Sequence, residues 1–160
     1  RIKDKFKFKN LFNSVSAYGV GSHRHVVEID QELSKIAKHN IKVTFTPHLI
    51  PMYRGILSTI YLETQKNYDA KKIYNFLKKY HKNNTFVKFA KYNKPIGTGN
   101  VINTNFCNIS VCTNRDKNKI IILSTIDNLI KGGSGQAVQN MNIFFNFKET
   151  LGLLWDFFRS

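Results

Sequence analysis

The sequence is poor in cysteine, proline and acidic residues, and it lacks any long apolar run. Its 160 residues include two cysteines, three prolines and ten aspartates and glutamates. No segment approaches the roughly 20 apolar residues of a membrane-spanning helix, and the opening RIKDKFKFKN lacks the apolar centre of a signal peptide. We therefore expect a cytoplasmic protein with reduced thiols and no membrane partner.

The two cysteines do not form a recognisable metal or redox motif. Cys107 and Cys112 are five positions apart, which fits no CxxC pattern. If both lie on one strand, their side chains point to opposite faces, so we expect no disulfide between them.

Acidic residues are scarce relative to basic ones, and the formal net charge is +15. Such a charge is compatible with a nucleic-acid-binding surface. The lysines are scattered, however, apart from pairs such as Lys71-Lys72 and Lys78-Lys79, and the abundance of lysine, asparagine and isoleucine is typical of an AT-rich genome. We expect compositional bias rather than a nucleic-acid partner, although a basic surface would still attract an anionic substrate.

With 42% hydrophobic residues, the chain can form a core, and we expect residues 1–160 to form a single domain. Apolar periodicity predicts three helices: 24–38 with Ser22 as N-cap, 69–81 with Asp69 as N-cap, and one from the turn at 132–135 to about 145. The middle helix should bury Ile73, Phe76, Leu77 and Tyr80. Strands are predicted at 11–18, 41–46, 56–63, 86–90, 104–112 and 119–126.

The predicted order is β-α-β-β-α-β-β-β-α. Short turns between consecutive strands favour antiparallel pairing, and the scarcity of βαβ units argues against a doubly wound nucleotide fold. We therefore expect an α+β fold with a mixed, mainly antiparallel sheet and helices on one face.

The stretch GSHRHVVEID, residues 21–30, is the first candidate site. If a helix starts after Ser22, its free N–H groups attract anions and disfavour a protonated histidine. A neutral His23 or His25 is then a suitable general base. Glu28 lies three positions after His25, and Arg24 could pair with it. A capped helix start with exposed histidines is the alternative. The i, i+2 spacing argues against a metal site.

Two further segments are candidates. In TFTPHLIPMYRG, residues 44–55, the prolines stiffen an extended segment, and Arg54 could bind a carboxylate or phosphate through two parallel hydrogen bonds. In DNLIKGGSGQAVQNMN, residues 127–142, glycines before a helix would let a ligand approach the backbone closely. A surface arginine and a flexible turn are the corresponding alternatives, since neither segment is a complete nucleotide-binding motif.

Together, HRHVVEI, TPHLIPMYRG, IDNLIKGGSGQAVQNMN and ETLGL resemble the C-terminal half of the N-acetyl-gamma-glutamyl-phosphate reductases, within the aspartate-semialdehyde-dehydrogenase-like superfamily. The resemblance covers most of residues 14–153. It implies a glyceraldehyde-3-phosphate-dehydrogenase-like C-terminal domain that packs against another subunit in a homo-oligomer, either a dimer or a tetramer. It also implies that the last helix, 133–146, packs on an N-terminal dinucleotide-binding half.

The resemblance also implies a reaction. NADPH would reduce N-acetyl-glutamyl 5-phosphate to N-acetyl-glutamate 5-semialdehyde with release of phosphate, in arginine biosynthesis and through a cysteine thioester. His23 and His25 would be catalytic, and Arg24, Glu28 and Arg54 would bind substrate. NADP would be bound by Gly132, Gly135, Gln136 and Asn140. No metal is implied.

The sequence departs from the family in two ways. The family's nucleophile, a cysteine in a Gly-Cys-Tyr turn, is absent from these 160 residues, so we expect the chain alone to be inactive. Val26-Val27 also replaces the usual Thr-Pro. Two alternatives stay open: a related aminoadipyl-phosphate reductase of lysine biosynthesis, and a basic nucleic-acid-binding module without enzymatic activity.

Overall fold

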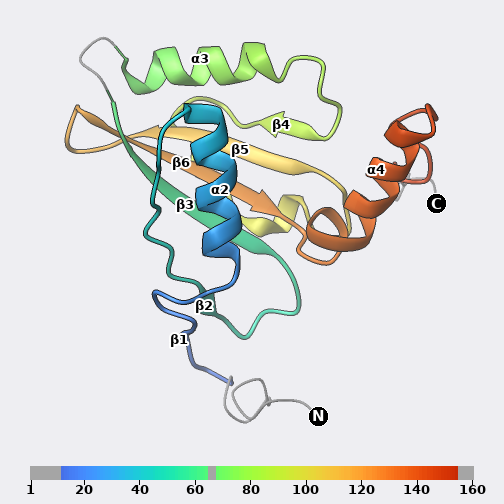
Figure 1. The fold of residues 1–160 in the computed structure, drawn as a ribbon, viewed down its shortest axis with the longest axis horizontal. Coiled ribbons are helices and arrows are strands. Elements are labelled where there is room, and N and C mark those ends of the chain that lie inside the picture. The colour runs from blue at the N-terminus through green and yellow to red at the C-terminus, as the bar shows by residue number, and fades with distance from the viewer. Residues whose placement is uncertain (1–11, 65–67, 155–160) are drawn as a thin grey trace. The chain divides into compact units, whose positions relative to one another are not determined.

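The structure is a computed structural model that describes residues 12–64 and 68–154. The chain divides into two compact units, residues 1–53 and 54–160, which we describe one at a time. Figure 1 shows the elements of both units. The expectation of one domain over residues 1–160 stays a prediction. Every helix among the described residues is too short or too polar to span a bilayer.

The first unit consists of one helix and a small antiparallel pair of strands. Strand β1 (Ser16–Ala17) pairs with β2 (His48–Leu49). Between them lies helix α2 (His25–Ala37), which confirms the helix predicted at 24–38. Its N-cap position is occupied by Arg24, without a side-chain capping bond, so the prediction of Ser22 as N-cap is wrong. The hydroxyl of Ser22 instead donates to the carbonyl of Val20 at 3.5 Å. Residue 11 of the predicted strand 11–18 lies outside the described residues.

The strand predicted at 41–46 is absent from the described structure. The backbone of this segment bonds to side chains of α2 instead of to another strand. Ile41 donates its N–H to the hydroxyl of Ser34 at 2.8 Å, and Val43 donates its N–H to the carboxylate of Asp30 at 2.9 Å. Because α2 provides these acceptors, the segment runs extended without a neighbouring strand.

The second unit contains a four-stranded sheet in the order β3-β6-β5-β4. Strand β6 (Lys119–Ile126) is antiparallel to both β3 (Ile56–Glu63) and β5 (Cys107–Thr113), whereas β4 (Val87–Phe89) pairs with β5 in parallel. This confirms the mixed, mainly antiparallel sheet of an α+β fold. Both cysteines are free, and both lie on β5.

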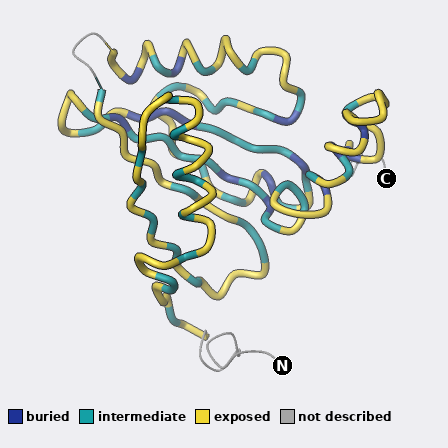
Figure 2. Tube along the Cα trace, in the orientation of Figure 1, coloured by how far each residue is buried: buried dark blue, intermediate teal, exposed yellow. Residues whose placement is uncertain are grey.

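Helix α3 (Ala70–Tyr80) packs on one face of this sheet, where it forms the main core. Asp69 caps the helix as predicted, because its carboxylate accepts the N–H of Lys72 at 2.7 Å. Figure 2 shows buried residues on the sheet side of α3 and exposed residues on the other side. Tyr74 is buried, but Phe76 and Tyr80 are 64% and 71% exposed, so their predicted burial is wrong. The packed face is formed by Ala70, Ile73, Tyr74 and Leu77.

Two short helical segments and a final helix complete the second unit. Segment η2 (Thr98–Asn100) precedes β5. After β6 the chain forms a π-helical turn, η3 (Ile130–Ser134), which is interrupted at Gly133, and then helix α4 (Gly135–Phe144). The helix begins within the glycine-rich turn, as predicted. Exposed apolar residues gather on α4 and just after it, including Ile143, Phe144, Phe145 and Phe147.

Candidate functional site

The histidine pair lies at the start of α2 in the first unit. The rings of His23 and His25 are 4.8 Å apart in an edge-to-face arrangement. Tyr18 and Phe45 also contact the ring of His23 edge-on, at 5.3 and 5.4 Å between centroids. His23 is therefore held half-buried, whereas His25 is exposed at the first helical position. The two histidines thus lie side by side at the helix start, and their catalytic roles stay predictions.

The backbone fixes the tautomer of His23. His25 donates its backbone N–H to Nδ1 of His23 at 3.3 Å, so Nδ1 acts as the acceptor and carries no proton in this geometry. The approach of this ring requires a glycine at position 19, which has φ +57° and where a Cβ would lie 3.2 Å from the side chain of His23. His23 thus accepts from the backbone through Nδ1, which leaves Nε2 as the ring nitrogen that can donate to a ligand.

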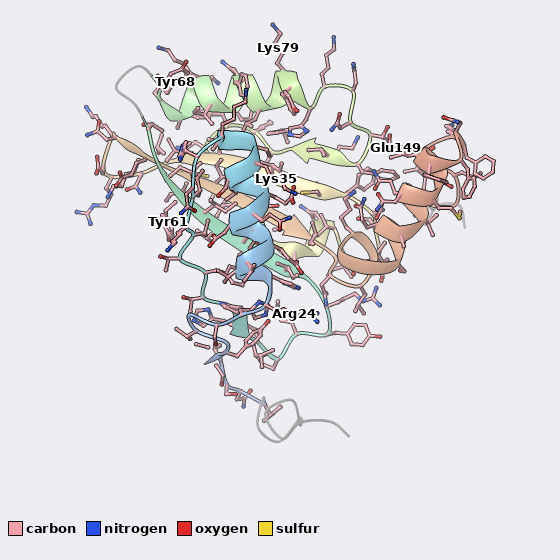
Figure 3. All side chains as sticks on the ribbon, viewed as in Figure 1. Arg24, Lys35, Tyr61, Tyr68, Lys79 and Glu149 are labelled. Carbon is pink, nitrogen blue, oxygen red and sulfur yellow. The ribbon has the colours of Figure 1, made fainter. Side chains whose placement is uncertain are left out.

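Arg24 and Glu28 flank the histidines on exposed positions of the same segment. Figure 3 shows Arg24 at the start of α2. In the described part of the chain, no ion pair joins Arg24 to Glu28. Both side chains are therefore available to a ligand, and their predicted roles in substrate binding stay predictions.

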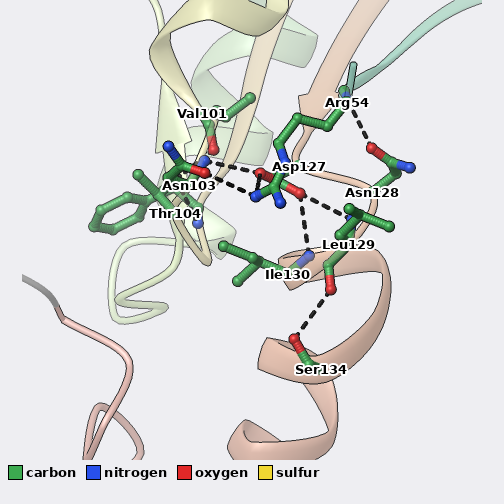
Figure 4. A network of polar contacts seen from close by, with 11 residues as sticks. Arg54, Val101, Asn103, Thr104, Asp127, Asn128, Leu129, Ile130 and Ser134 are labelled. Carbon is green, nitrogen blue, oxygen red and sulfur yellow. Dashed lines mark hydrogen bonds and ion pairs between the residues drawn. The ribbon is translucent and has the colours of Figure 1, made fainter. Parts of the chain in front are cut away.

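Arg54 lies in the second unit, where it contacts the fully buried Asp127 (Figure 4). Its guanidinium donates to the carboxylate of Asp127 at 3.1 Å and to the side-chain oxygen of Asn103 at 2.7 Å. The side chain of Arg54 is 17% exposed. The structure therefore gives Arg54 a structural role that the sequence did not indicate, and its predicted role in binding an anion stays a prediction.

Asp127 accepts hydrogen bonds on both carboxylate oxygens. The backbone N–H groups of Leu129 and Ile130 donate to Oδ1, and the backbone N–H of Asn103 donates to Oδ2. Burial alone would raise the pKa of this carboxyl, but these backbone bonds and Arg54 outweigh that effect and hold the pKa of Asp127 below its ordinary value. The ionised carboxylate thus connects Arg54 to the start of η3.

Gly55 completes the same corner. Its N–H donates to the side-chain oxygen of Asn128 at 2.6 Å, and its φ of +115° is one that L side chains rarely adopt. A Cβ on Gly55 would lie 2.9 Å from the Cβ of Thr98. Arg54 and Gly55 therefore hold the start of β3 close to η2 and to the residues that follow β6.

The glycine-rich turn follows directly from Asp127, whose backbone carbonyl accepts the N–H of Gly132 at 3.1 Å. Gly132 and Gly133 are exposed, and α4 begins without a side-chain cap. Gly135 is buried, and a Cβ there would lie 2.5 Å from the side-chain oxygen of Asn105. The Asp127 carboxylate thus brings Arg54 and this turn together, which the sequence did not indicate.

Three of the predicted cofactor ligands, Gly135, Gln136 and Asn140, lie on the first turns of α4. The amide of Gln136 donates to the side-chain oxygen of Asn140 at 2.9 Å, across one helical turn. This bond orders the two amides on one side of the helix. Their contact with a cofactor stays a prediction.

A second polar network lies beneath the turn. Gln139 accepts on its side-chain oxygen from Lys131 at 2.7 Å and from Asn105 at 2.9 Å, and its amide donates to the carboxylate of Glu149 at 2.7 Å. Burial lowers the pKa of Lys131, and the nearby Cys107 and Glu149 act in the opposite direction. This network anchors α4 to the segment before β5.

Sequence reasoning did not assign these buried polar residues a role. Asp127 offered the clearest signal, because an aspartate that directly follows an apolar strand and precedes a turn often accepts nearby backbone N–H groups. Asn105, Gln139 and Glu149 offered none, since their pairing depends on contacts between distant segments. Among residues 12–64 and 68–154, no group of three or more His, Cys, Asp or Glu side chains is arranged to hold a metal ion.

Comparison with known proteins places these features in a family. Relatives similar to this chain include the N-acetyl-gamma-glutamyl-phosphate reductases of Thermoanaerobacter pseudethanolicus, 48% identical over 140 residues, and of Afipia carboxidovorans, 45% identical over 151 residues. These alignments cover 88% and 94% of this chain but 41% and 43% of the relatives. The chain thus spans about two-fifths of the length of the curated relatives it matches.

The fold is also found in a solved structure. The crystal structure of aspartate semialdehyde dehydrogenase II from Vibrio cholerae matches with a TM-score of 0.61 at 18% identity, covering 77% of this chain and 37% of that one. At this identity the likeness supports the fold alone. Residues 1–128 match the family model described as semialdehyde dehydrogenase, dimerisation domain. By that match, which spans most of the sequence, the chain belongs to the semialdehyde dehydrogenase dimerisation-domain family.

Proposed function

We propose that this chain is the substrate-binding and dimerisation part of an NADP-dependent N-acetyl-gamma-glutamyl-phosphate reductase that acts in the cytoplasm in arginine biosynthesis. The observation that carries the proposal is 48% identity over 140 residues to a protein of that name. The reaction reduces N-acetyl-glutamyl 5-phosphate to the 5-semialdehyde and releases phosphate.

The glycine-rich turn fits a nicotinamide cofactor. Gly132 and Gly133 are exposed and carry no side chain, so a ligand could approach the backbone of this turn closely, although the N–H groups of Gly132, Ser134 and Gly135 already donate within the turn. Gln136 and Asn140 would offer side-chain amides from the first turns of α4. Gly135 is buried, so it would act by allowing the turn to pack on Asn105. NADPH would supply the hydride.

The histidines would manage protons in this reaction. His23 has Nδ1 occupied by the backbone N–H of His25, so its Nε2–H would act as the proton donor to a reacting group. His25 is exposed beside it and would either share that role or contact the substrate. Arg24 and Glu28, both exposed on the same segment, would orient the substrate.

Arg54 would contribute positive charge for the anionic substrate while it is fixed by Asp127. An arginine with a buried carboxylate partner is held in one orientation, which reduces the entropy lost on binding. Nη1 of the guanidinium donates to Asp127 and Asn103, and the side chain as a whole is 17% exposed, so a ligand would meet only the exposed part of this side chain.

The proposal includes two protein partners. The family model is named for dimerisation, and strand β3 carries exposed apolar residues that include Leu57 and Tyr61. We propose that these residues pack against another copy in a homo-oligomer. The exposed Phe144, Phe145 and Phe147 at the end of α4 would pack on an N-terminal dinucleotide-binding half that carries the nucleophilic cysteine.

The direct test is an enzyme assay of the intact protein that contains this chain, run in the reverse direction as phosphate-dependent reduction of NADP by N-acetyl-glutamate 5-semialdehyde. We expect activity from the intact protein and none from residues 1–160 alone. The competing substrate is aminoadipate semialdehyde attached to its carrier, which a reductase of lysine biosynthesis would use. A preference for that compound, or no activity with either, would contradict the proposal.

Substitution of the histidines tests their roles in the same assay. Asparagine preserves a side-chain acceptor near the N–H of residue 25 but cannot transfer a proton. We expect His23→Asn or His25→Asn to lower kcat by about 10²–10⁴, the usual contribution of acid–base catalysis. If both variants stay within about threefold of the unmodified enzyme, neither histidine is the acid–base group.

A further inference from the structure

The second unit has a basic groove on the side of the fold that carries α3. We call it the α3–β4 groove. It has a volume of about 530 Å³ and is lined by Lys78, Lys79, Lys82 and Lys88, with His81 and Phe89 among its other residues. Figure 3 shows Lys79 pointing outward from α3, away from the sheet. The groove therefore brings lysines on and just after α3 together with Lys88 of the edge strand β4.

The charge of this region is uniform. Residues 70–115 contain eight lysines and one arginine, and they contain no aspartate or glutamate. This stretch includes α3, β4 and β5, so all of its basic residues lie in the second unit. Among the residues that the structure describes, no acidic residue lines the α3–β4 groove, so the positive potential of its lysines is not offset by a carboxylate in the groove itself.

Aromatic rings run through the same surface. The rings of Phe76 and Tyr80 are stacked, with centroids 6.2 Å apart and planes 24° apart. Tyr80 contacts His81 at 5.0 Å, and His81 contacts Phe89 in the groove at 6.0 Å. Phe76 and Tyr80 stay largely exposed, although the same helix packs Tyr74 into the core. The result is a series of four rings, of which His81 and Phe89 line the groove and Phe76 and Tyr80 continue from it along α3.

We propose that the α3–β4 groove and the adjacent Phe76–Tyr80 pair bind single-stranded nucleic acid. The ammonium groups would neutralise backbone phosphates, and bases would stack on the exposed rings, which tolerate any sequence. This inference goes beyond the reductase function and does not rest on it, because none of the proposed catalytic or cofactor-binding residues lies on α3 or β4.

Other partners fit this surface less well. A membrane would require the apolar face of α3, but Ala70 and Tyr74 on that face are buried against the sheet. A second copy of this chain carries the same +15 charge and offers no acidic surface of comparable size. A base-free polyanion would satisfy the lysines but would leave the stacked rings without a role.

Binding can be measured by fluorescence anisotropy with a labelled single-stranded RNA of about 15 nucleotides, a length that a basic groove of this kind can cover. The intact protein that contains this chain is used. If the four groove lysines each neutralise one phosphate, the logarithm of affinity should change with that of salt with a slope of about −2.8, so affinity falls about fiftyfold between 50 and 200 mM salt.

The lysines are tested by charge reversal with a matched control. The triple variant Lys78→Glu/Lys79→Glu/Lys82→Glu should lose most of its affinity, and its salt slope should become shallower by about 2. The control triple Lys38→Glu/Lys42→Glu/Lys148→Glu has the same net charge and changes exposed lysines elsewhere. It should keep the slope of the unmodified protein. Equal losses in the two triples would show a response to net charge alone and would overturn the proposal.

The rings are tested separately. Phe76→Ala/Tyr80→Ala should weaken RNA binding about tenfold or more, since stacking on an aromatic side chain contributes substantially for each base. The same variant should bind inorganic polyphosphate as the unmodified protein does. Both side chains are exposed, so circular dichroism should show an unchanged fold. Unchanged RNA affinity, or equal binding to phosphatidylserine vesicles, would overturn the assignment to nucleic acid.

Discussion

Asp127 shows how a single buried charge can organise a corner of this fold. Its carboxylate accepts hydrogen bonds from Arg54 and from the backbone N–H groups of Asn103, Leu129 and Ile130. Three separate segments therefore meet at one residue that is fully buried. A buried ion pair adds little net stability compared with an apolar pair, but removal of one member leaves the other charge without a partner.

The substitution Asp127→Asn keeps the shape of the side chain and removes its charge. We expect the free energy of unfolding to fall by about 3 kcal/mol, because Arg54 keeps its charge in a largely buried position. Urea denaturation followed by circular dichroism measures this difference. The control Glu63→Gln removes a carboxylate that is 85% exposed and 3.6 Å from Lys119, and should change stability by less than about 1 kcal/mol. Equal effects of the two substitutions would contradict this role of Asp127.

The same residue predicts a dependence of stability on pH. The pKa of Asp127 is lower in the folded chain than its ordinary value of 3.8, so the folded state binds this proton less readily than the unfolded state. Its contribution is therefore complete above the unfolded pKa and is lost as pH falls through the folded pKa.

Unfolding experiments between pH 7 and pH 2 can isolate this contribution. The difference in unfolding free energy between the unmodified chain and Asp127→Asn should be constant from pH 7 to about pH 5 and should shrink below about pH 4. A difference that stays constant down to pH 2 would show that ionisation of Asp127 is not its source.

Residue-scale prediction from the sequence worked where contacts are local. The HRH spacing places the rings of His23 and His25 next to each other because only one residue separates them. The partner of Arg54 could not be predicted in the same way, since Asp127 lies 73 positions further along the chain. Pairing over such a separation depends on the packing of β3 next to β6, which a single sequence does not specify.

At the scale of elements, strongly patterned segments were predicted well. The segments ILSTIYLE and KIIILSTI form β3 and β6 with the expected bounds, because β-branched residues fill both. The segment IKVTFT has a similar composition but does not form a strand, since Ser34 and Asp30 of α2 accept its N–H groups. Strand propensity is therefore insufficient where a neighbouring helix provides the acceptors.

Gly55 tests how the β3 corner is built. Its φ of +115° and the 2.9 Å approach to the Cβ of Thr98 leave no room for a side chain. We expect Gly55→Ala to lower the free energy of unfolding by about 2 kcal/mol, through backbone strain and displacement of Thr98. Thermal and urea denaturation measure the loss.

Gly97 provides a matched control for this substitution. It lies next to Thr98 but has φ −131°, and a Cβ there would have nothing within 4 Å. Gly97→Ala should leave stability unchanged or raise it slightly, because the unfolded chain loses conformational freedom. If the two alanine variants have the same stability, the corner tolerates a side chain and our interpretation of Gly55 is wrong.

At the scale of the whole molecule, the two faces of the sheet differ in what covers them. Ile60 and Leu62 of β3 lie opposite Ile122 and Ile120, which belong to the core beneath α3. Because side chains alternate along a strand, Leu57 and Tyr61 point to the other face. They are 50% and 68% exposed, which is unusual for apolar side chains on the face of a sheet. Exposed apolar side chains of this kind are expected where a second subunit covers the face, and the family model is named for dimerisation.

We therefore expect Leu57 and Tyr61 to lie in the interface between subunits of the intact protein. Leu57→Asp/Tyr61→Asp places two charges where apolar surface would be buried. Burial would remove the hydration of these charges, which costs free energy because no partner charge replaces the water. The expected result is a shift of the oligomer to monomers at micromolar concentration, measured by sedimentation velocity. Phe76→Asp, an exposed aromatic on the outer side of α3 and so on the opposite side of the sheet, should leave the oligomer intact. An unchanged sedimentation coefficient for the double variant would place the interface elsewhere, whereas dissociation of the Phe76 variant would place it on α3.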